Sequence, residues 1–492
     1  MKYIATFDIG TTAVKGVLID VNGAPAYSRS IGIETIYEDN FKEQRPNDWY
    51  EAFCAISKEF FAQGFAPDDI TGIVMSGQMQ DLIPVDKSGR PVCNAILYSD
   101  GRADEQAREI GKIIGLRNIA ESTGNNFDGS LPFSKLLWIK QNQPNVFERI
   151  YKVLISSKDY VILKLTAFFV TDVTSASTSG LMDIHKKLWN DAWADAVGID
   201  KAVLPKLLYA DEKAGEVTNK ASSETGYKAG TPVYAGTGDA GATTLASGIT
   251  KDGEFNINLG TSGWVACVSS DILAKENVFN LSAMPRDSYI NVVPFFNAGN
   301  VHKWISKTLT KDDEQHLKYD YVDRILEQSV PGSNGLMFLP YLAGERFPVV
   351  DTGIRGGYYG ISPETTKQDM ARSCLEGVAF SIRQGIESIG RRPMKISMIG
   401  GGAQVRVWCQ IFADVLNHEI LVYKNAEILP AVAIAAAALV GEGRIPDYHA
   451  FTDSLQKSDN CICYKPKAKS AELYDSIYSR YLSLYPAFKS IK

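Results

Sequence analysis

The sequence predicts an α/β protein with two related domains. Its 492 residues are more than one ordinary hydrophobic core accommodates. The same pattern occurs once in each half, at Tyr3–Asp20 (YIATFDIGTTAVKGVLID) and at Gly253–Ser269 (GEFNINLGTSGWVACVS). In both segments two apolar runs flank a turn that contains Gly-Thr, which is typical of a β-hairpin. We therefore expect two similar domains, each presenting one hairpin to a common cleft.

The first hairpin has the residue types of an anion-binding turn. Gly10 lets a ligand approach the backbone without a side chain in between. The hydroxyls and amides of Thr11 and Thr12 can point at an anion. Asp8, at the end of the first strand, suits a hydrated Mg²⁺ above that anion. The alternative interpretation is an ordinary hairpin with an Asx-type turn.

Composition restricts the partners and the compartment. A net charge of −6 without a basic stripe argues against nucleic acid as a partner. The longest apolar run, 431–440, is too short to span a bilayer. We see no secretory leader before Tyr3, and the seven cysteines suit reduced thiols, so we expect a cytoplasmic protein. The sequence leaves the assembly state open, a homodimer included.

A buried strand, Ile70–Met75, runs into the polar segment Ser76–Asp81 (SGQMQD). Polar side chains at this position lie at the carboxyl edge of a sheet, where α/β folds bind ligands. Neutral groups that both donate and accept match sugar hydroxyls, although a polar turn is the alternative. A second strand, Ala95–Ser99, ends at Asp100, which either caps the helix at Ala103–Ile114 or binds a polyol.

A third motif lies between the strand at Thr231–Gly236 and the helix at Ala240–Gly248. Its glycine spacing matches the dinucleotide fingerprint, but Asp239 would then repel a pyrophosphate, so we reject that interpretation. A carboxylate at a helix N-terminus stays ionised and can accept a proton from a bound hydroxyl. A plain N-cap aspartate is the alternative.

A fourth motif, Gly400–Ala403 (GGGA), follows the strand at Lys395–Ile399. Three glycines allow a flat base and ribose to lie against bare backbone. Pro430 and Gly441 bound an alanine-rich helix, whose small side chains we expect to pack closely behind the nucleotide.

Together and in this order, the two hairpins, SGQMQD, SDGR at 99–102, GTGDAGA at 236–242 and GGGA resemble the FGGY family of carbohydrate kinases. Within that family the sequence is most similar to xylulose kinases. The resemblance implies an α/β fold of two actin-like, ribonuclease-H-like domains with the active-site cleft between them. It places a sugar-binding domain with the first phosphate hairpin at 1–245. A domain with the second hairpin and the adenosine site would span 246–492.

The resemblance also implies roles for individual residues. Asp239 corresponds to the catalytic base, and Asp8 and Asp239 would hold Mg²⁺. The residues expected to line the sugar pocket are Gln78, Met79, Gln80, Asp100 and Asp239. Those expected to hold ATP are Gly10, Thr11, Thr12, Lys15, Gly260, Thr261, Gly401, Gly402, Ala403 and Gln404. Similar kinases keep a Gly-Glu-Arg run like Gly344-Glu345-Arg346, where we expect an ion pair that holds the loop.

The chain departs from the pattern at two positions. Similar xylulose kinases have Met-His where this chain has Met79-Gln80, and family members often have a basic residue where Gln404 stands. D-xylulose is the first choice of substrate, with ribulose, gluconate, erythritol and glycerol as alternatives. An actin- or chaperone-like ATPase is the rival class. It would not need Gln78, Gln80 and Asp239 to converge on a second pocket.

Overall fold

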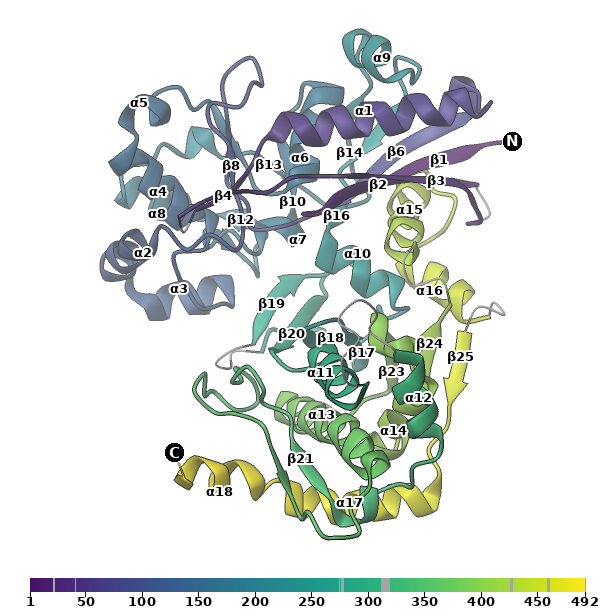
Figure 1. The fold of residues 1–492 in the computed structure, drawn as a ribbon. Coiled ribbons are helices and arrows are strands. Elements are labelled where there is room, and N and C mark those ends of the chain that lie inside the picture. Colours follow the sequence, from purple (N-terminus) through teal and green to yellow (C-terminus); the bar gives the residue numbers. More distant parts are fainter. Residues whose placement is uncertain are drawn as a thin grey trace. The chain divides into compact units, whose positions relative to one another are not determined.

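The computed structural model describes residues 1–20, 23–39, 41–273, 275, 278–310, 319–424, 428–457 and 461–491 (Figure 1). The chain forms two compact units. The first unit comprises Met1–Thr250, Ser270–Ile290 and Glu427–Ser454, and the second comprises Lys251–Ser269, Asn291–Ala426 and Leu455–Lys492. The first change of unit lies close to the expected boundary at 245/246, but two later stretches return to the first unit. The division therefore differs from a single cut in the chain.

The sheet of the first unit has the strand order β14-β15-β6-β1-β2-β3, and β16 also pairs with β6. The strands are β1 Tyr3–Ile9, β2 Ala13–Asp20, β3 Pro25–Gly32, β6 Ile70–Gly77, β14 Lys213–Glu216, β15 Pro232–Tyr234 and β16 Thr237–Gly238. β1 and β2 are antiparallel, as the first hairpin predicts. β6 runs parallel to β1, β15 and β16, so these strands end at one edge of the sheet.

The register of these parallel strands aligns three polar residues. Asp8 of β1 is opposite Ser76 of β6, and Ser76 is opposite Thr237 of β16. Polar groups from distant parts of the sequence thus share the carboxyl edge of the sheet. The prediction that SGQMQD follows a buried strand at this edge is confirmed.

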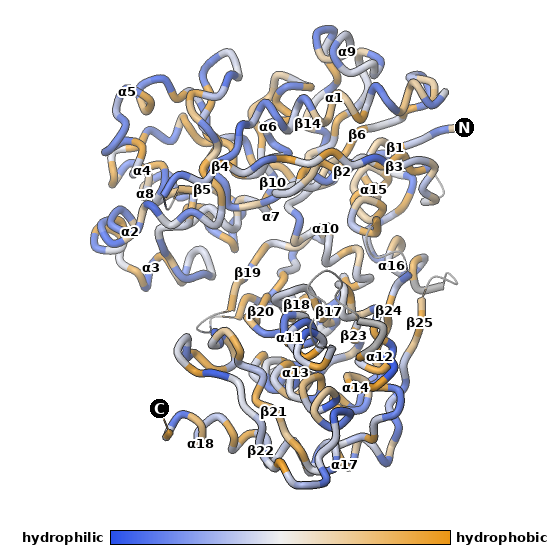
Figure 2. The backbone as a smooth tube through the Cα atoms, in the orientation of Figure 1, coloured by the Kyte–Doolittle hydropathy of each residue, from blue (hydrophilic) through white to orange (hydrophobic). Residues whose placement is uncertain are grey.

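Helices cover both faces of this sheet. Alternate residues of β1, Ala5 and Phe7 among them, share a core with Trp49 and Phe53 of α1 (Pro46–Ala62), and α6 (Ser157–Thr166) joins that core. α15 (Leu429–Gly441) lies against β1 and β6 (Figure 1), and Figure 2 shows it mainly in hydrophobic colours.

The alanine-rich helix is therefore confirmed, and it lies in the first unit, whereas the GGGA motif lies in the second. All residues of α15 from Ala431 to Leu439 are buried in the first unit. Small side chains let a helix approach a sheet closely, and periodicity alone does not indicate which sheet it approaches.

The second unit contains a sheet with the order β20-β18-β17-β23-β24-β25. Its strands are β17 Glu254–Leu259, β18 Gly263–Ser269, β20 Tyr289–Phe295, β23 Lys395–Ile399, β24 Ile420–Tyr423 and β25 Cys461–Tyr464. β17 and β18 form the second predicted hairpin. β23 runs parallel to β17, so the turn of the hairpin and Gly400 lie at the same edge. The helices of this unit include α11 Gly299–Thr310, α12 Tyr319–Glu327, α13 Lys367–Ile389, α14 Arg406–Leu416 and α17 Ala468–Tyr481.

The helices among the described residues include none with the length and apolar character needed to cross a membrane.

Replacing Gly236 by alanine should destabilise the first unit. Gly236 has φ +63°, and an added Cβ would overlap the carbonyl oxygen of Met75 in the central strand. We expect the free energy of unfolding to fall by more than about 2 kcal/mol, measured by urea denaturation. Gly230→Ala is the matched control, because Gly230 has φ +89° but open space around it. Its cost should stay near 1–2 kcal/mol, the approximate cost of the backbone conformation alone. Equal losses in both variants would contradict the steric argument.

Candidate functional site

Two carboxylates lie at the shared strand edge of the first unit. Asp8 Oδ1 accepts a 2.9 Å hydrogen bond from the hydroxyl of Ser76. Asp239 is the first residue of α10 (Asp239–Ala246), and its Oδ1 accepts a 2.7 Å hydrogen bond from the backbone N–H of Ala240. The N-cap is Gly238, so the plain N-cap interpretation of Asp239 is wrong.

The surroundings of these carboxylates change their proton affinity. Burial raises the pKa of Asp8, although the hydrogen bond from Ser76 and the charge of Lys15 lower it. The side chain of Asp239 is accessible to solvent, yet the protein atoms packed around it, together with repulsion from Asp8, raise its pKa to about 7. The aligned strands place the two acids near one another, because Asp8 is opposite Ser76, Ser76 is opposite Thr237, and Asp239 follows two residues later. A divalent cation with hydrated oxygen ligands would relieve their repulsion, so the pair fits Mg²⁺.

A buried ionic network supports the strand that immediately precedes Asp239. Lys158 Nζ lies 2.7 Å from Asp159 Oδ1 and 2.9 Å from Asp172 Oδ1, and all three side chains are buried. Asp172 Oδ2 in turn accepts a 3.3 Å hydrogen bond from Thr237, two residues before Asp239. The sequence gives no role to these residues, because the partners that complete the network, Asp172 and Thr237, come from other elements.

The first hairpin is held by two glutamines. Gln44 Nε2 donates a 2.7 Å hydrogen bond to the carbonyl of Thr11, and the Thr11 hydroxyl donates to Gln78 Oε1 at 2.5 Å. Gln78 Nε2 donates to Gln44 Oε1 at 2.9 Å, so the glutamines also bind each other. Gln78 is only 1% exposed. Its amide therefore fixes the hairpin, and the structure brings the sugar motif and the hairpin together.

The next residues of the motif differ in exposure. Met79 is buried and packs against Gly238, where an added Cβ would overlap its sulfur. Gln80 is partly exposed and donates a 2.8 Å hydrogen bond to Ser130 Oγ. Met79 thus packs beside the Asp239 loop, and Gln80 is the accessible member of the pair.

Asp100 has four hydrogen bonds and is fully buried. Its two oxygens accept from the backbone N–H of Lys42 and from the backbone N–H, Nε and Nη2 of Arg102. The N-cap of the following helix, α2 (Asp104–Ile110), is Ala103, so the interpretation of Asp100 as a cap is wrong. The bonds to Arg102 lower the pKa of Asp100, although burial raises it. Asp100 therefore anchors this loop as an ionised group.

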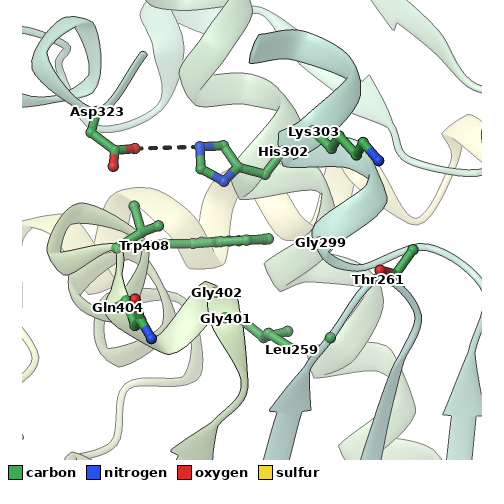
Figure 3. Close-up of a pocket in the computed structure, with 12 residues that line it drawn as sticks. Leu259, Thr261, Gly299, His302, Lys303, Asp323, Gly401, Gly402, Gln404 and Trp408 are labelled. Carbon is green, nitrogen blue, oxygen red and sulfur yellow. Dashed lines mark ion pairs between the residues drawn. The ribbon is translucent and has the colours of Figure 1, made fainter. Parts of the chain in front are cut away.

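The second unit contains a pocket of about 720 Å³ (Figure 3). Five residues predicted to contact ATP line it together: Gly260, Thr261, Gly401, Gly402 and Gln404. Ala403, the sixth, is buried next to them. Gly400 has φ +91°, and an added Cβ would lie 2.7 Å from the carbonyl of Leu259, so only glycine lets the two loops approach. Gly10, Thr12 and Lys15 lie on the first hairpin, in the other unit.

Sequence analysis missed one side of this pocket. Gly299, His302 and Lys303 contribute from α11 and Asp323 from α12. His302 Nε2 lies 3.3 Å from Asp323 Oδ1, and its ring packs edge-on against the ring of Trp408 (Figure 3). A glycine that opens a helix shortly after a strand was the available signal.

Glu345 fixes the turn that leads into α11. It accepts hydrogen bonds from the backbone N–H of Phe296 at 2.7 Å and from Asn297 Nδ2 at 2.9 Å. The turn continues into Gly299, whose N–H donates to the carbonyl of Gly260 at 2.8 Å. The guanidinium of Arg346 lies over the ring of Phe296, 4.7 Å from its centroid. Amide hydrogen bonds thus hold this loop, and the expected ion pair is not what fixes it.

Comparison with protein families gives matches for both halves of the chain. Residues 3–246 match the N-terminal domain of the FGGY family of carbohydrate kinases, and residues 255–439 match its C-terminal domain.

Individual relatives span nearly the full chain. A xylulose kinase from Staphylococcus xylosus is 30% identical, with 99% of this chain and 100% of that protein covered. The ligand-bound structure of a xylulose kinase from Lactobacillus acidophilus has a TM-score of 0.87 at 26% identity, covering 99% of both chains. A gluconate kinase structure from the same organism has a TM-score of 0.87 at 27% identity, covering 99% of this chain and 98% of that one. The fold is therefore the two-domain fold of these kinases, as predicted.

The pKa of Asp239 gives a direct test of the carboxylate pair. In the protein without ligands, Asp239 should take up a proton as the pH falls through about 7, because the protein atoms packed around it and the charge of Asp8 favour the neutral acid. Potentiometric titration of the wild type minus Asp239→Asn isolates this proton. Asp8→Asn should shift the difference curve to lower pH, since it removes a nearby negative charge. A midpoint near 4 in the wild type would contradict the arrangement.

Proposed function

Since the chain belongs to the FGGY family of carbohydrate kinases, we propose that it transfers the γ-phosphoryl group of ATP to a hydroxyl of D-xylulose. The product is D-xylulose 5-phosphate. The observation that carries the proposal is the position of Asp239, which opens α10 at the strand edge shared by Asp8 and the segment SGQMQD. Its surroundings raise its pKa to about 7. Such a group accepts a proton near neutral pH and also returns it to solvent.

In the proposed reaction a sugar hydroxyl oxygen forms a bond to the γ-phosphorus of ATP. The bond from that phosphorus to the oxygen bridging to the β-phosphate breaks, and ADP leaves. Asp239 accepts the hydroxyl proton. Catalysis by positioning dominates phosphoryl transfer, so the fixed geometry of Asp239 on β16 and α10 supports this role.

The remaining predicted residues supply charge and position. Asp8 and Asp239 would hold a hydrated Mg²⁺, which would neutralise phosphate charge when bound. The amide of Thr12, with Lys15, would face the phosphates on the first hairpin. The N–H of Gly10 donates to the carbonyl of Ala13 within the turn, so we assign Gly10 to the close approach of backbone and phosphate. The hydroxyl of Thr11 is already used by Gln78, so we assign Thr11 to holding the hairpin.

We assign the pocket of the second unit to the adenosine part of ATP. Bare backbone at Gly401 and Gly402 gives a flat base a surface to lie on. Gly260 and Thr261 would place backbone groups near the phosphates.

Two alternatives differ in substrate. A sugar acid is supported by the similarity to a gluconate kinase structure, and an ATPase without a sugar is supported only by the shared hairpins. The xylulose kinase names among the full-length relatives favour the ketose. We place the protein in the cytoplasm, where ATP is available.

A coupled assay for ADP release tests this assignment. D-xylulose, D-ribulose, gluconate, glycerol and erythritol would each be offered with ATP and Mg²⁺, and D-xylulose should give the highest kcat/KM. ADP release that is independent of every sugar would refute the kinase proposal.

Asp239→Asn should lower kcat by about 10² to 10⁴-fold, the usual contribution of a general base. Binding of ADP should stay close to wild type, because the adenosine pocket lies in the other unit. Wild-type kcat in this variant would remove Asp239 from the role of base.

Glu345→Gln should weaken ADP binding about tenfold, since an amide N–H₂ would then face the donor that Glu345 now accepts from. Calorimetric titration with ADP measures the effect. Glu364→Gln, an exposed glutamate of the same unit, is the control. Unchanged ADP affinity in Glu345→Gln would contradict the link from this loop to the second hairpin.

A further inference from the structure

Gln80 stands on a constrained backbone. Its φ is +65°, a conformation that few residues other than glycine adopt. The buried ammonium of Lys135 holds this backbone, donating to the carbonyl of Gln80 at 3.2 Å and to that of Leu97 at 2.7 Å. Position 80 is thus fixed before any ligand binds.

A hydrogen-bond chain decides which way the amide of Gln80 points. Asp128 Oδ1 accepts from the backbone N–H and from the hydroxyl of Ser130. A carboxylate only accepts, so the single hydroxyl proton of Ser130 is used on Asp128. Ser130 Oγ therefore accepts at its contact with Gln80, and the group at 2.8 Å must be the N–H₂ of Gln80. The backbone carbonyl of Ser130, 3.4 Å from the same nitrogen, demands the same orientation.

The same hydrogen-bond chain gives the amide oxygen of Gln80 no donor among the described residues. Among the described residues the hydrogen bonds of the Gln80 side chain all run through Nε2. Oε1 accepts hydrogen bonds but cannot donate them. A hydroxyl can donate to Oε1, whereas a carboxylate cannot.

The charges around Gln80 also disfavour a carboxylate in the ligand. Asp128 is exposed and negative beside Ser130. Two cations of this region already have partners: Lys135 binds the carbonyls of Gln80 and Leu97, and Arg102 binds Asp100 and Glu43. A sugar carboxylate placed here would meet repulsion from Asp128 and the oxygen of Gln80.

We propose that Asp128 and Ser130 are specificity-determining positioning residues, which hold Gln80 with its amide oxygen toward the sugar. The substrate is then a neutral polyhydroxy compound with a hydroxyl at this point, and sugar acids are rejected. This inference rests on the proposed kinase function and specifies its substrate class.

Ser130→Ala and Asp128→Ala test the orientation. Ser130→Ala removes the acceptor that holds the N–H₂ group, and Asp128→Ala removes the acceptor of the Ser130 hydroxyl proton, so that this hydroxyl can turn toward Gln80. We expect wild-type kcat/KM for D-xylulose to exceed that for gluconate more than about 100-fold. In both variants that ratio should fall about tenfold, mainly through a higher KM for D-xylulose.

Three controls show whether a changed ratio comes from the orientation of the Gln80 amide, from misfolding or from the loss of a negative charge. Ser130→Thr keeps the hydroxyl and should keep the wild-type ratio. Asp195→Asn removes an exposed acid elsewhere in the first unit and should also leave the ratio unchanged. ADP affinity and Tm of each variant report whether the fold is intact.

The outcomes distinguish this inference from the proposed function. Preference for gluconate in the wild type, or an unchanged ratio in folded Ser130→Ala, overturns the inference while the protein remains a sugar kinase. If D-ribulose, glycerol or erythritol replaces D-xylulose as best substrate, the D-xylulose assignment fails and the inference stands. If no sugar is phosphorylated, the kinase proposal fails. Calorimetry with D-xylulose and gluconate then decides the inference, since preferential gluconate binding would overturn it.

Discussion

The parallel alignment of β1, β6 and β16 is the constraint on which the first unit's site depends. Strands that end at one edge place Asp8, Ser76 and Thr237 in one row. Asp239 follows two residues after Thr237, so its carboxylate comes near Asp8. Desolvation by the surrounding protein, together with the charge of Asp8, raises its pKa. The alignment also requires glycine at position 236, because a side chain there would meet the carbonyl of Met75 and push β16 away from β6.

In each hairpin an amide N–H donates a hydrogen bond to a carbonyl of the turn. In the first unit Gln44 donates to the carbonyl of Thr11, and in the second the N–H of Gly299 donates to the carbonyl of Gly260. Groups that are already oriented require little rearrangement as charge develops, which is how enzymes stabilise phosphoryl transfer. The two halves of the chain thus use different residues, a glutamine side chain and a backbone N–H, to fix the turn of the hairpin.

Local sequence predicted what local interactions determine. Both hairpins, the strand before SGQMQD and the alanine-rich helix follow from glycine placement and apolar periodicity, and the structure has them. The sequence did not reveal which sheet α15 covers, nor that Gln78 and Asp100 are used internally. Those facts depend on partners such as Thr11 and Arg102 that only the tertiary structure brings close. The α11 side of the pocket was missed because Gly299 is a single glycine without a repeated motif.

The central claim is that a sugar hydroxyl, held beside Asp239, takes the phosphoryl group that water takes in an ATPase. Phosphorus NMR of a complete reaction with D-xylulose, ATP and Mg²⁺ tests this most directly, because it identifies the acceptor. We predict a new phosphate monoester signal that grows in step with ADP and is lost when D-xylulose is omitted. Inorganic phosphate as the only product, formed equally with and without sugar, would contradict the account.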